Sequence, residues 1–279
     1  MSKKSGIGVI FLLLLSLGVI FLGYHHAANQ KEEMMAQANG AQQDKKEETA
    51  KEKNLNTDAF EEKRDQLSIV DYITYLQQQK DETTISFYGQ LADEEKWPEE
   101  VKDFLEEQTG KEVNANRLTK EKTDTYQLAV SEDDKDLTET KTDVVFYLLP
   151  SIGDKKRDIS LDDSSSYIER SIKKIQKALP ESLIVAVTPH PDSSELGNRN
   201  SRTLDYTAYM ERGIKAAEEM ELPIFDLHKD FQEQLDDDKT ELGNYLTSDG
   251  DILNSKGTAL QVQLFQAFLS EPIDTTNGI

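Results

Sequence analysis

A serine, a histidine and an aspartate in this sequence could together cleave an ester. The candidates are the Ser86 hydroxyl as nucleophile, the His190 imidazole as base and the Asp249 carboxylate as the group that orients the base. Such a reaction needs an alcohol, a base that removes its proton, and donors for the developing oxyanion. Ser86 lies inside a predicted strand, however, and a structural role explains His190 in its Thr-Pro-His-Pro segment better than ligand binding does. The sequence allows this triad but does not favour it.

The sequence offers no recognisable site for a metal ion or a cofactor. It has no cysteine, which excludes disulfides and cysteine-based zinc, haem or redox centres. The acidic runs at residues 236–238 and 249–251 lack the glycine and terminal glutamate spacing of a calcium loop, so we interpret them as solvated turns. No phosphate loop, dinucleotide-binding fingerprint or zinc-protease motif is present. We therefore expect neither a metal nor a cofactor.

Two kinds of periodicity alternate along residues 67–269. Short apolar or β-branched runs predict strands, and apolar residues three or four positions apart predict helices between them. The predicted strands are 83–88, 143–149, 183–187 and 223–227, and the predicted helices are 67–79, 96–108, 164–179, 203–220 and 257–269. This alternation predicts an α/β three-layer sandwich with a mostly parallel sheet and a flavodoxin-like layout.

Local signals mark the ends of some of these helices. Gly110 stands where a helix-terminating glycine is expected after residues 96–108. At the start of the helix predicted at 164–179, Ser166 and Glu169 have the spacing of a capping box. His228 follows a predicted strand, and we expect it to cap or flank the next helix.

Segments that follow the predicted strands are the places where a site is expected. In open α/β sheets, ligands bind beyond the carboxyl ends of the strands. The relevant segments are 89–92, 150–154, 188–191 and 248–257, the last of which precedes the closing helix. We expect a cleft lined by Gly89, Gln90, Leu91, Ser151, His190, Asp249 and Ile252.

The order and spacing of these segments resemble the SGNH (GDSL) hydrolase family over residues 83 to 269. That family opens with a strand and a Gly-Asp-Ser block, and here the corresponding run is Phe87-Tyr88-Gly89-Gln90-Leu91, with Trp97 on the next helix. The family ends with Asp-x-x-His before a final helix, and residues 249–257 match the surrounding pattern, including Asn254 and Lys256-Gly257. The resemblance implies an SGNH-type fold and ancestors that cleaved acetyl or acyl esters of carbohydrates or lipids.

This sequence departs from the family pattern at the positions of the family's catalytic residues. Leu91 stands where the resemblance places the nucleophile, and Ile252 where it places the histidine. The family's oxyanion-hole glycine has no counterpart in residues 118–126, and its asparagine has none in residues 150–154. Of the residues that act in catalysis in the family, Asp249 alone is retained. We expect the ordinary serine mechanism to be lost and the domain to act by binding. Two alternatives stay open: an active esterase with an atypical site, and an interaction or scaffold protein of another α/β family.

The first 26 residues predict a membrane anchor. Lys3 and Lys4 precede an uncharged apolar run from Ile7 to Tyr24. At a rise of about 1.5 Å per residue, this run nearly spans a bilayer core of about 30 Å. The positive-inside rule places residues 1–26 as a cytoplasmic tip and anchor, 27–66 as a charged spacer, and 67–279 as an extracytoplasmic domain. A cleaved secretion signal is the alternative.

The net charge of the chain argues against one class of binding partner. A net charge of -22 argues against nucleic acid, since phosphate contacts need clustered lysine and arginine. We expect a bacterial surface protein that contacts the membrane through residues 7–24 and binds an envelope glycan or another envelope protein.

Overall fold

The computed structural model describes residues 60–131 and 134–278. Within these ranges no helix has the length and apolar character needed to cross a membrane. The predicted anchor at residues 7–24 and the spacer up to residue 59 lie outside the described residues.

Five parallel strands form one sheet in the order β2-β1-β3-β4-β5. They are β1 (Thr84–Gln90), β2 (Asn114–Lys120), β3 (Val144–Leu148), β4 (Leu183–Val187) and β5 (Ile224–Phe225). This is the flavodoxin-like strand order, whose direction of winding reverses between β1 and β3. The predicted α/β class with a parallel sheet is confirmed.

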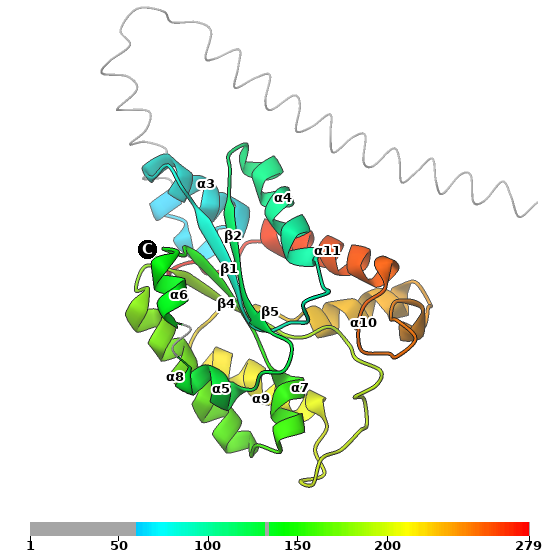
Figure 1. Ribbon diagram of the computed structural model, residues 1–279. Helices are drawn as coiled ribbons and strands as arrows, with labels where there is room; N and C mark the ends of the chain where they lie inside the picture. Colours follow the sequence, from blue (N-terminus) through cyan, green and yellow to red (C-terminus); the bar gives the residue numbers. More distant parts are fainter. Residues whose placement is uncertain (1–59, 132–133, 279) are drawn as a thin grey trace, which may run out of the picture. The chain divides into compact units, whose positions relative to one another are not determined.

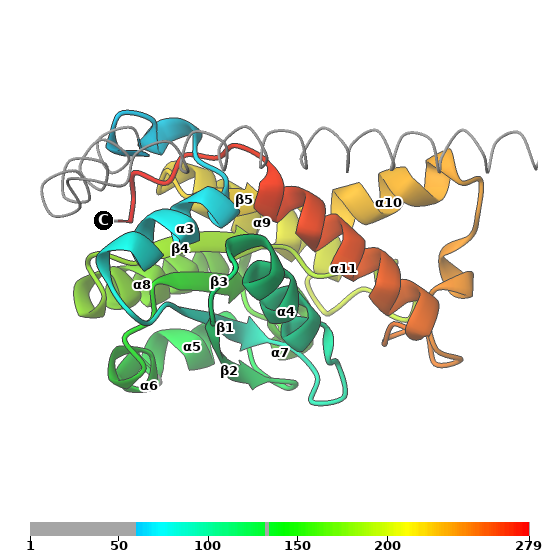
Figure 2. The ribbon, with the colours of Figure 1, turned by 90° about the horizontal axis from the view of Figure 1, so that it is seen from above.

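Helices cover both faces of the sheet (Figures 1 and 2). One face packs against α3 (Ile69–Gln79), α4 (Trp97–Thr109), α10 (Leu227–Asp237) and α11 (Ser255–Ser270). The other packs against α5 (Thr125–Val130), α6 (Asp134–Glu139), α8 (Leu161–Ala178) and α9 (Tyr206–Glu219), and the short α7 (Ser151–Arg157) contacts α9. Two 3-10 turns lie at Arg64–Gln66 and Leu242–Asn244.

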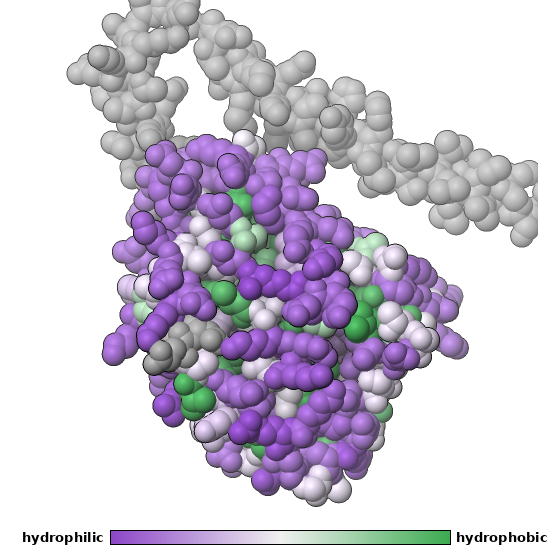
Figure 3. All heavy atoms as spheres, in the orientation of Figure 1, coloured by the Kyte–Doolittle hydropathy of each residue, from purple (hydrophilic) through white to green (hydrophobic). Residues whose placement is uncertain are grey.

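Alternate side chains of each central strand enter the two cores. Phe87 and Phe146 point to one face, where their rings stack at 5.2 Å, while Tyr88 and Tyr147 point to the other. On the first face the single tryptophan, Trp97, stacks on Phe265 at 4.7 Å. This contact packs the start of α4 against the second half of α11. The face of the domain seen in Figure 3 is mainly hydrophilic, in keeping with the many charged residues of the chain.

The helix ends agree with the sequence signals in one case and correct them in another. Gly110 ends α4 in the left-handed conformation with φ of 69°, as predicted. The predicted capping box at Ser166 and Glu169 is wrong, because α8 begins earlier. Ser160 is the N-cap of α8, and its hydroxyl accepts the Asp163 amide N–H. The Ser166 hydroxyl instead donates to the Asp162 carbonyl within the helix.

A buried carboxylate joins three helices on one side of the site. Asp154 of α7 accepts hydrogen bonds from the backbone amide of Thr125 at 2.7 Å, from the Thr125 hydroxyl at 3.0 Å and from the Ser164 hydroxyl. Loss of hydration on burial outweighs these donors and raises the pKa of Asp154 to about 6 from its usual 3.8. Asp154 therefore makes stability depend on pH.

We predict that Asp154→Asn stabilises the domain at pH 7 and leaves it unchanged near pH 4. Between pH 3.8 and about 6 the folded state holds the Asp154 proton more tightly than the unfolded state. The free energy of unfolding therefore falls as pH rises through this window, in total by about 3 kcal/mol. Asparagine stays neutral, and the two hydroxyls can reverse their hydrogen bonds to it. Urea unfolding of both proteins at several pH values tests this, and an equal difference at pH 4.5 and 7 would contradict it.

Candidate functional site

A cavity of about 510 Å³ lies at the carboxyl ends of the parallel strands. This volume falls in the usual range for small-molecule sites. Its walls come from the loops that follow β1, β2, β3 and β4 and from the loop before α11. The topology therefore places the candidate site where the strand-end segments predict it.

The predicted cleft residues divide into two groups in the structure. Gln90, Leu91, His190 and Ile252 line the cavity, whereas Gly89, Ser151 and Asp249 are not among its lining residues. Gly89, with φ of 132°, packs so closely on β3 that a Cβ would lie 2.1 Å from the Leu148 carbonyl oxygen. Ser151 is buried at the start of α7, and Asp249 is exposed.

The structure does not bring Ser86, His190 and Asp249 together. Ser86 is fully buried inside β1 and shares a 2.7 Å hydrogen bond with the Thr142 hydroxyl. Thr142 precedes β3, so this hydroxyl pair belongs to the amino ends of the strands. His190 follows β4, at the opposite ends. Ser86 does not line the cavity and cannot act on a ligand there.

The loop after β1 is held by an arginine on the edge strand. Arg117 of β2 donates from its two terminal nitrogens to the backbone carbonyls of Ala92 and Glu95. Its Nε donates to the Thr119 hydroxyl at 3.1 Å, which fixes the guanidinium plane. The loop that carries Leu91 and Glu95 into the cavity is thereby given one conformation.

Gln90 cross-links three segments at the cavity. Its Nε2 donates to the Glu121 carbonyl at 2.9 Å, and its Oε1 accepts the Gly153 amide N–H at 3.2 Å. The Gly153 amide lies in the first turn of α7, where a backbone donor could otherwise face a ligand. In this structure the Gly153 amide donates to Gln90 instead of to a ligand.

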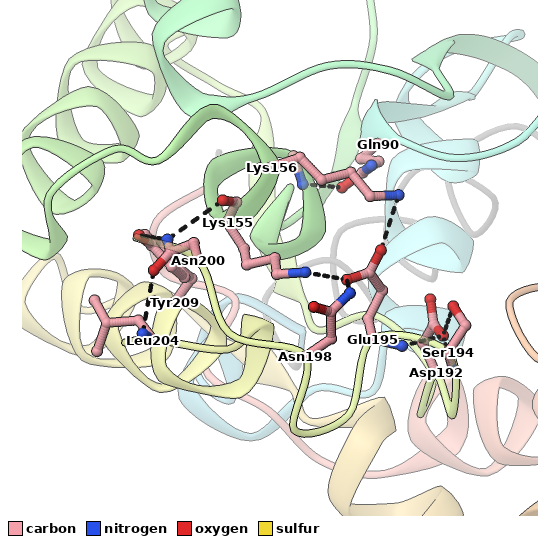
Figure 4. A network of polar contacts seen from close by, with 11 residues as sticks. Gln90, Lys155, Lys156, Asp192, Ser194, Glu195, Asn198, Asn200, Leu204 and Tyr209 are labelled. Atoms are coloured by element: carbon pink, nitrogen blue, oxygen red, sulfur yellow. Dashed lines mark hydrogen bonds and ion pairs between the residues drawn. The ribbon is translucent and has the colours of Figure 1, made fainter. Parts of the chain in front are cut away.

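The loop between β4 and α9 is fastened to α7 by a buried ion pair (Figure 4). The Glu195 carboxylate contacts the ammonium groups of Lys155 and, at 3.1 Å, Lys156. Desolvation opposes ionisation of Glu195, but the two lysines overcome it and the pKa of Glu195 is lowered. Asp192 organises the same loop by accepting the amide N–H groups of Ser194 and Glu195. These contacts therefore hold residues 189–192, which form part of the cavity wall, in position.

A histidine and a carboxylate face each other on the cavity wall. His190 Nε2 lies 3.9 Å from Glu95 Oε2, and the two side chains are only 12% and 10% exposed. His190 Nδ1 lies 3.0 Å from the Pro191 carbonyl, so it carries the proton in the neutral ring. Within residues 60–131 and 134–278, Glu95 Oε2 has no hydrogen-bond partner. The sequence analysis found His190 but missed Glu95, which stands in a polar run with no distinguishing pattern.

Other polar atoms around this cavity are also unpaired. Buried side-chain atoms without a hydrogen-bond partner occur on three more lining residues, namely Trp97 Nε1, Thr123 Oγ1 and Gln261 Oε1. In the described ranges no group of three or more histidine, cysteine or acidic side chains could hold a metal ion. The arrangement is suited to hydrogen bonding with an organic ligand.

Comparison with known proteins identifies the fold. No model of a protein family and no curated protein matches the sequence. Among solved structures, the acetyl xylan esterase AlAXEase matches with a TM-score of 0.53 and 18% identity, over 66% of this chain and 98% of that chain. Axe2, an acetylxylan esterase from Geobacillus stearothermophilus, matches with a TM-score of 0.52 and 16% identity, over 67% and 94%.

A third match bears on the predicted family directly. A protein described as a GDSL-like lipase from Parabacteroides merdae matches with a TM-score of 0.51 and 12% identity, over 67% of this chain and 95% of that chain. At these identities the matches establish the fold. The chain has the fold of the SGNH hydrolases, and the predicted resemblance is confirmed at that level.

Proposed function

We propose that this chain is an SGNH-hydrolase-like protein that binds its ligand without cleaving it. The observation that carries the proposal is that Leu91 and Ile252 both line the cavity. By the family resemblance these positions would hold the nucleophile and the histidine. Hydrocarbon side chains can neither attack a carbonyl carbon nor accept a proton. The cleft is thus retained while its hydrolytic groups are replaced.

The surroundings of Gln90 support the same function. An oxyanion needs free hydrogen-bond donors at the site of attack. The Gly153 amide donates to Gln90, and the Gln90 side-chain amide donates to the Glu121 carbonyl. These donors stabilise the resting cleft instead of a reaction intermediate.

We further propose that the domain acts at the outer face of a bacterial membrane, anchored by residues 7–24, and that its ligand is an envelope glycan. The apolar run and its flanking lysines support the anchor. The glycan is supported by the polar atoms that line the cavity and by the esterases of similar fold, two of which are described as acting on acetylated xylan.

One observation favours a second function, an esterase with an atypical site. His190 and Glu95 adjoin in the cavity and could serve as a base and its partner, with water as the nucleophile. An esterase of this kind would hydrolyse an ester at a rate that depends on both side chains. An assay of hydrolysis therefore distinguishes the esterase from a protein that only binds its ligand.

The test measures both properties on the purified full-length chain. We expect no hydrolysis of 4-nitrophenyl acetate above the buffer rate, and binding of a neutral oligosaccharide such as N-acetylglucosamine tetramer, read from Trp97 fluorescence. Ile252→Arg should abolish binding, whereas Leu196→Arg, at an exposed position, should not. Turnover lost in His190→Ala or Glu95→Gln would overturn the binding proposal in favour of the esterase.

A further inference from the structure

We propose that the cleft binds a primary ammonium group between Glu95 and His190, and that its ligand is a glycan bearing a free amino group, such as a de-N-acetylated amino sugar. The inference rests on the proposed function, since it specifies the ligand of the same cleft. It assigns Glu95 a role that the family resemblance does not give it.

The first step is the incomplete pairing of Glu95. Its side chain is nine-tenths buried, and Oε1 accepts only a long hydrogen bond, 3.4 Å, from the Ala92 amide. Oε2 has no hydrogen-bond partner among the residues that the structure describes. A buried carboxylate is costly unless a cation or several donors compensate it. The loop that holds Glu95 is nevertheless clamped by Arg117, so the fold keeps the carboxylate in this place.

The second step is the tautomer of His190. In the neutral tautomer whose Nδ1 donates to the Pro191 carbonyl, Nε2 presents its lone pair toward Glu95 Oε2. Two acceptors then face each other at 3.9 Å, too far apart for a direct hydrogen bond. A single nitrogen with several protons can donate to both. An ammonium has three such protons, whereas a sugar hydroxyl has only one.

The third step is the charge of the cavity wall. Of the three basic residues that line it, Arg157 contacts Asp124 at 3.0 Å and Lys156 contacts Glu195 at 3.1 Å. Lys122 is the third basic residue. Apart from Asp124, four carboxylates line the cavity and outnumber it, namely those of Glu95, Glu121, Asp192 and Asp251. The cavity therefore favours a cationic ligand over an anionic one.

Three more lining residues carry buried polar atoms that are unpaired within the described part of the chain, and atoms of these types can pair with hydroxyl groups. Thr123 Oγ1 can donate or accept, Gln261 Oε1 accepts and Trp97 Nε1 donates. A polyhydroxylated ring carries both donors and acceptors and can pair with such a mixed set. An amino sugar supplies the ammonium and these hydroxyls in one molecule, which is why we favour it over an isolated amine.

The experiment compares two tetramers that share one sugar backbone, fully de-N-acetylated glucosamine and N-acetylglucosamine, at 150 mM salt. Charge-assisted hydrogen bonds contribute about 1.5–3 kcal/mol, so we expect the amino form to bind the full-length chain at least about tenfold more tightly. Glu95→Gln, which keeps the shape of the side chain, should abolish this preference. Glu121→Gln, at an exposed carboxylate on the same cavity, should change it less than about twofold.

Several results would overturn the inference. Equal affinity for both tetramers would reject the ammonium site but not the proposed glycan binding. If neither tetramer binds, both the ammonium site and the proposed glycan binding are rejected. A preference that survives Glu95→Gln, or that Glu121→Gln lowers equally, would mean general attraction to an acidic protein. Tri-lysine binding more tightly than the amino tetramer would reject the glycan. If Glu95→Gln does not fold, His190→Leu provides the second test, with the preference again expected to fall.

Discussion

Glu195→Gln should lower the free energy of unfolding by about 3–5 kcal/mol, because it leaves a buried ammonium without its counter-charge. The Lys155 side chain is only 7% exposed, and Glu195 is the one carboxylate paired with it in the described part of the chain. Glutamine keeps the shape of glutamate but cannot neutralise Lys155. Urea unfolding followed by Trp97 fluorescence measures the loss.

Lys156→Met is the matched control for this prediction. Lys156 contacts the same carboxylate, but its side chain is 63% exposed, so its removal should cost less than about 1 kcal/mol. Replacing both members of the buried pair, as in Lys155→Met with Glu195→Leu, should recover most of the stability. A Glu195→Gln variant within 1 kcal/mol of the wild type would show that water reaches the pair.

This ion pair is also an example of a contact that could not be predicted from the sequence. Lys155 and Glu195 are 40 residues apart and stand in polar runs that look like solvated loops. Only the packing of α7 against α9 and its preceding loop buries them. Glu95 is a similar case, since its position on the cavity wall depends on the loop that Arg117 holds. Contacts of this kind arise from tertiary structure and have no local pattern.

The buried strands were predictable for the opposite reason. β4 matches its predicted range of 183–187, because a strand buried on both faces is a continuous apolar run. β2, whose residues are exposed or only partly buried, has no such run and was missed. The short helices α5, α6 and α7 were missed because six or seven residues give too little periodicity. Leu91 and Ile252 were found because motif spacing, rather than periodicity, marks them.

Gly153→Ala should be the most disruptive small substitution at the cleft, with a loss of about 3 kcal/mol or more in the free energy of unfolding. A Cβ at residue 153 would lie 1.7 Å from the Thr123 carbonyl oxygen and 2.7 Å from its carbon. These are backbone atoms, so no side-chain rotation relieves the overlap, and α7 must move away from the loop after β2. That movement would also break the hydrogen bond from the Gly153 amide to Gln90.

The same substitution should remove ligand binding even where the protein still folds. Residues 121–124 and 152–153 form adjoining parts of the cavity wall, so their separation changes the shape of the cavity. Gly243→Ala is the control, because a Cβ there meets no atom within 4 Å; we expect a change within about 0.5 kcal/mol and unaltered binding. If Gly153→Ala bound the glycan with wild-type affinity, the contact between α7 and the β2 loop would not shape the site. Binding would then depend on other lining residues, among them Glu95 and His190.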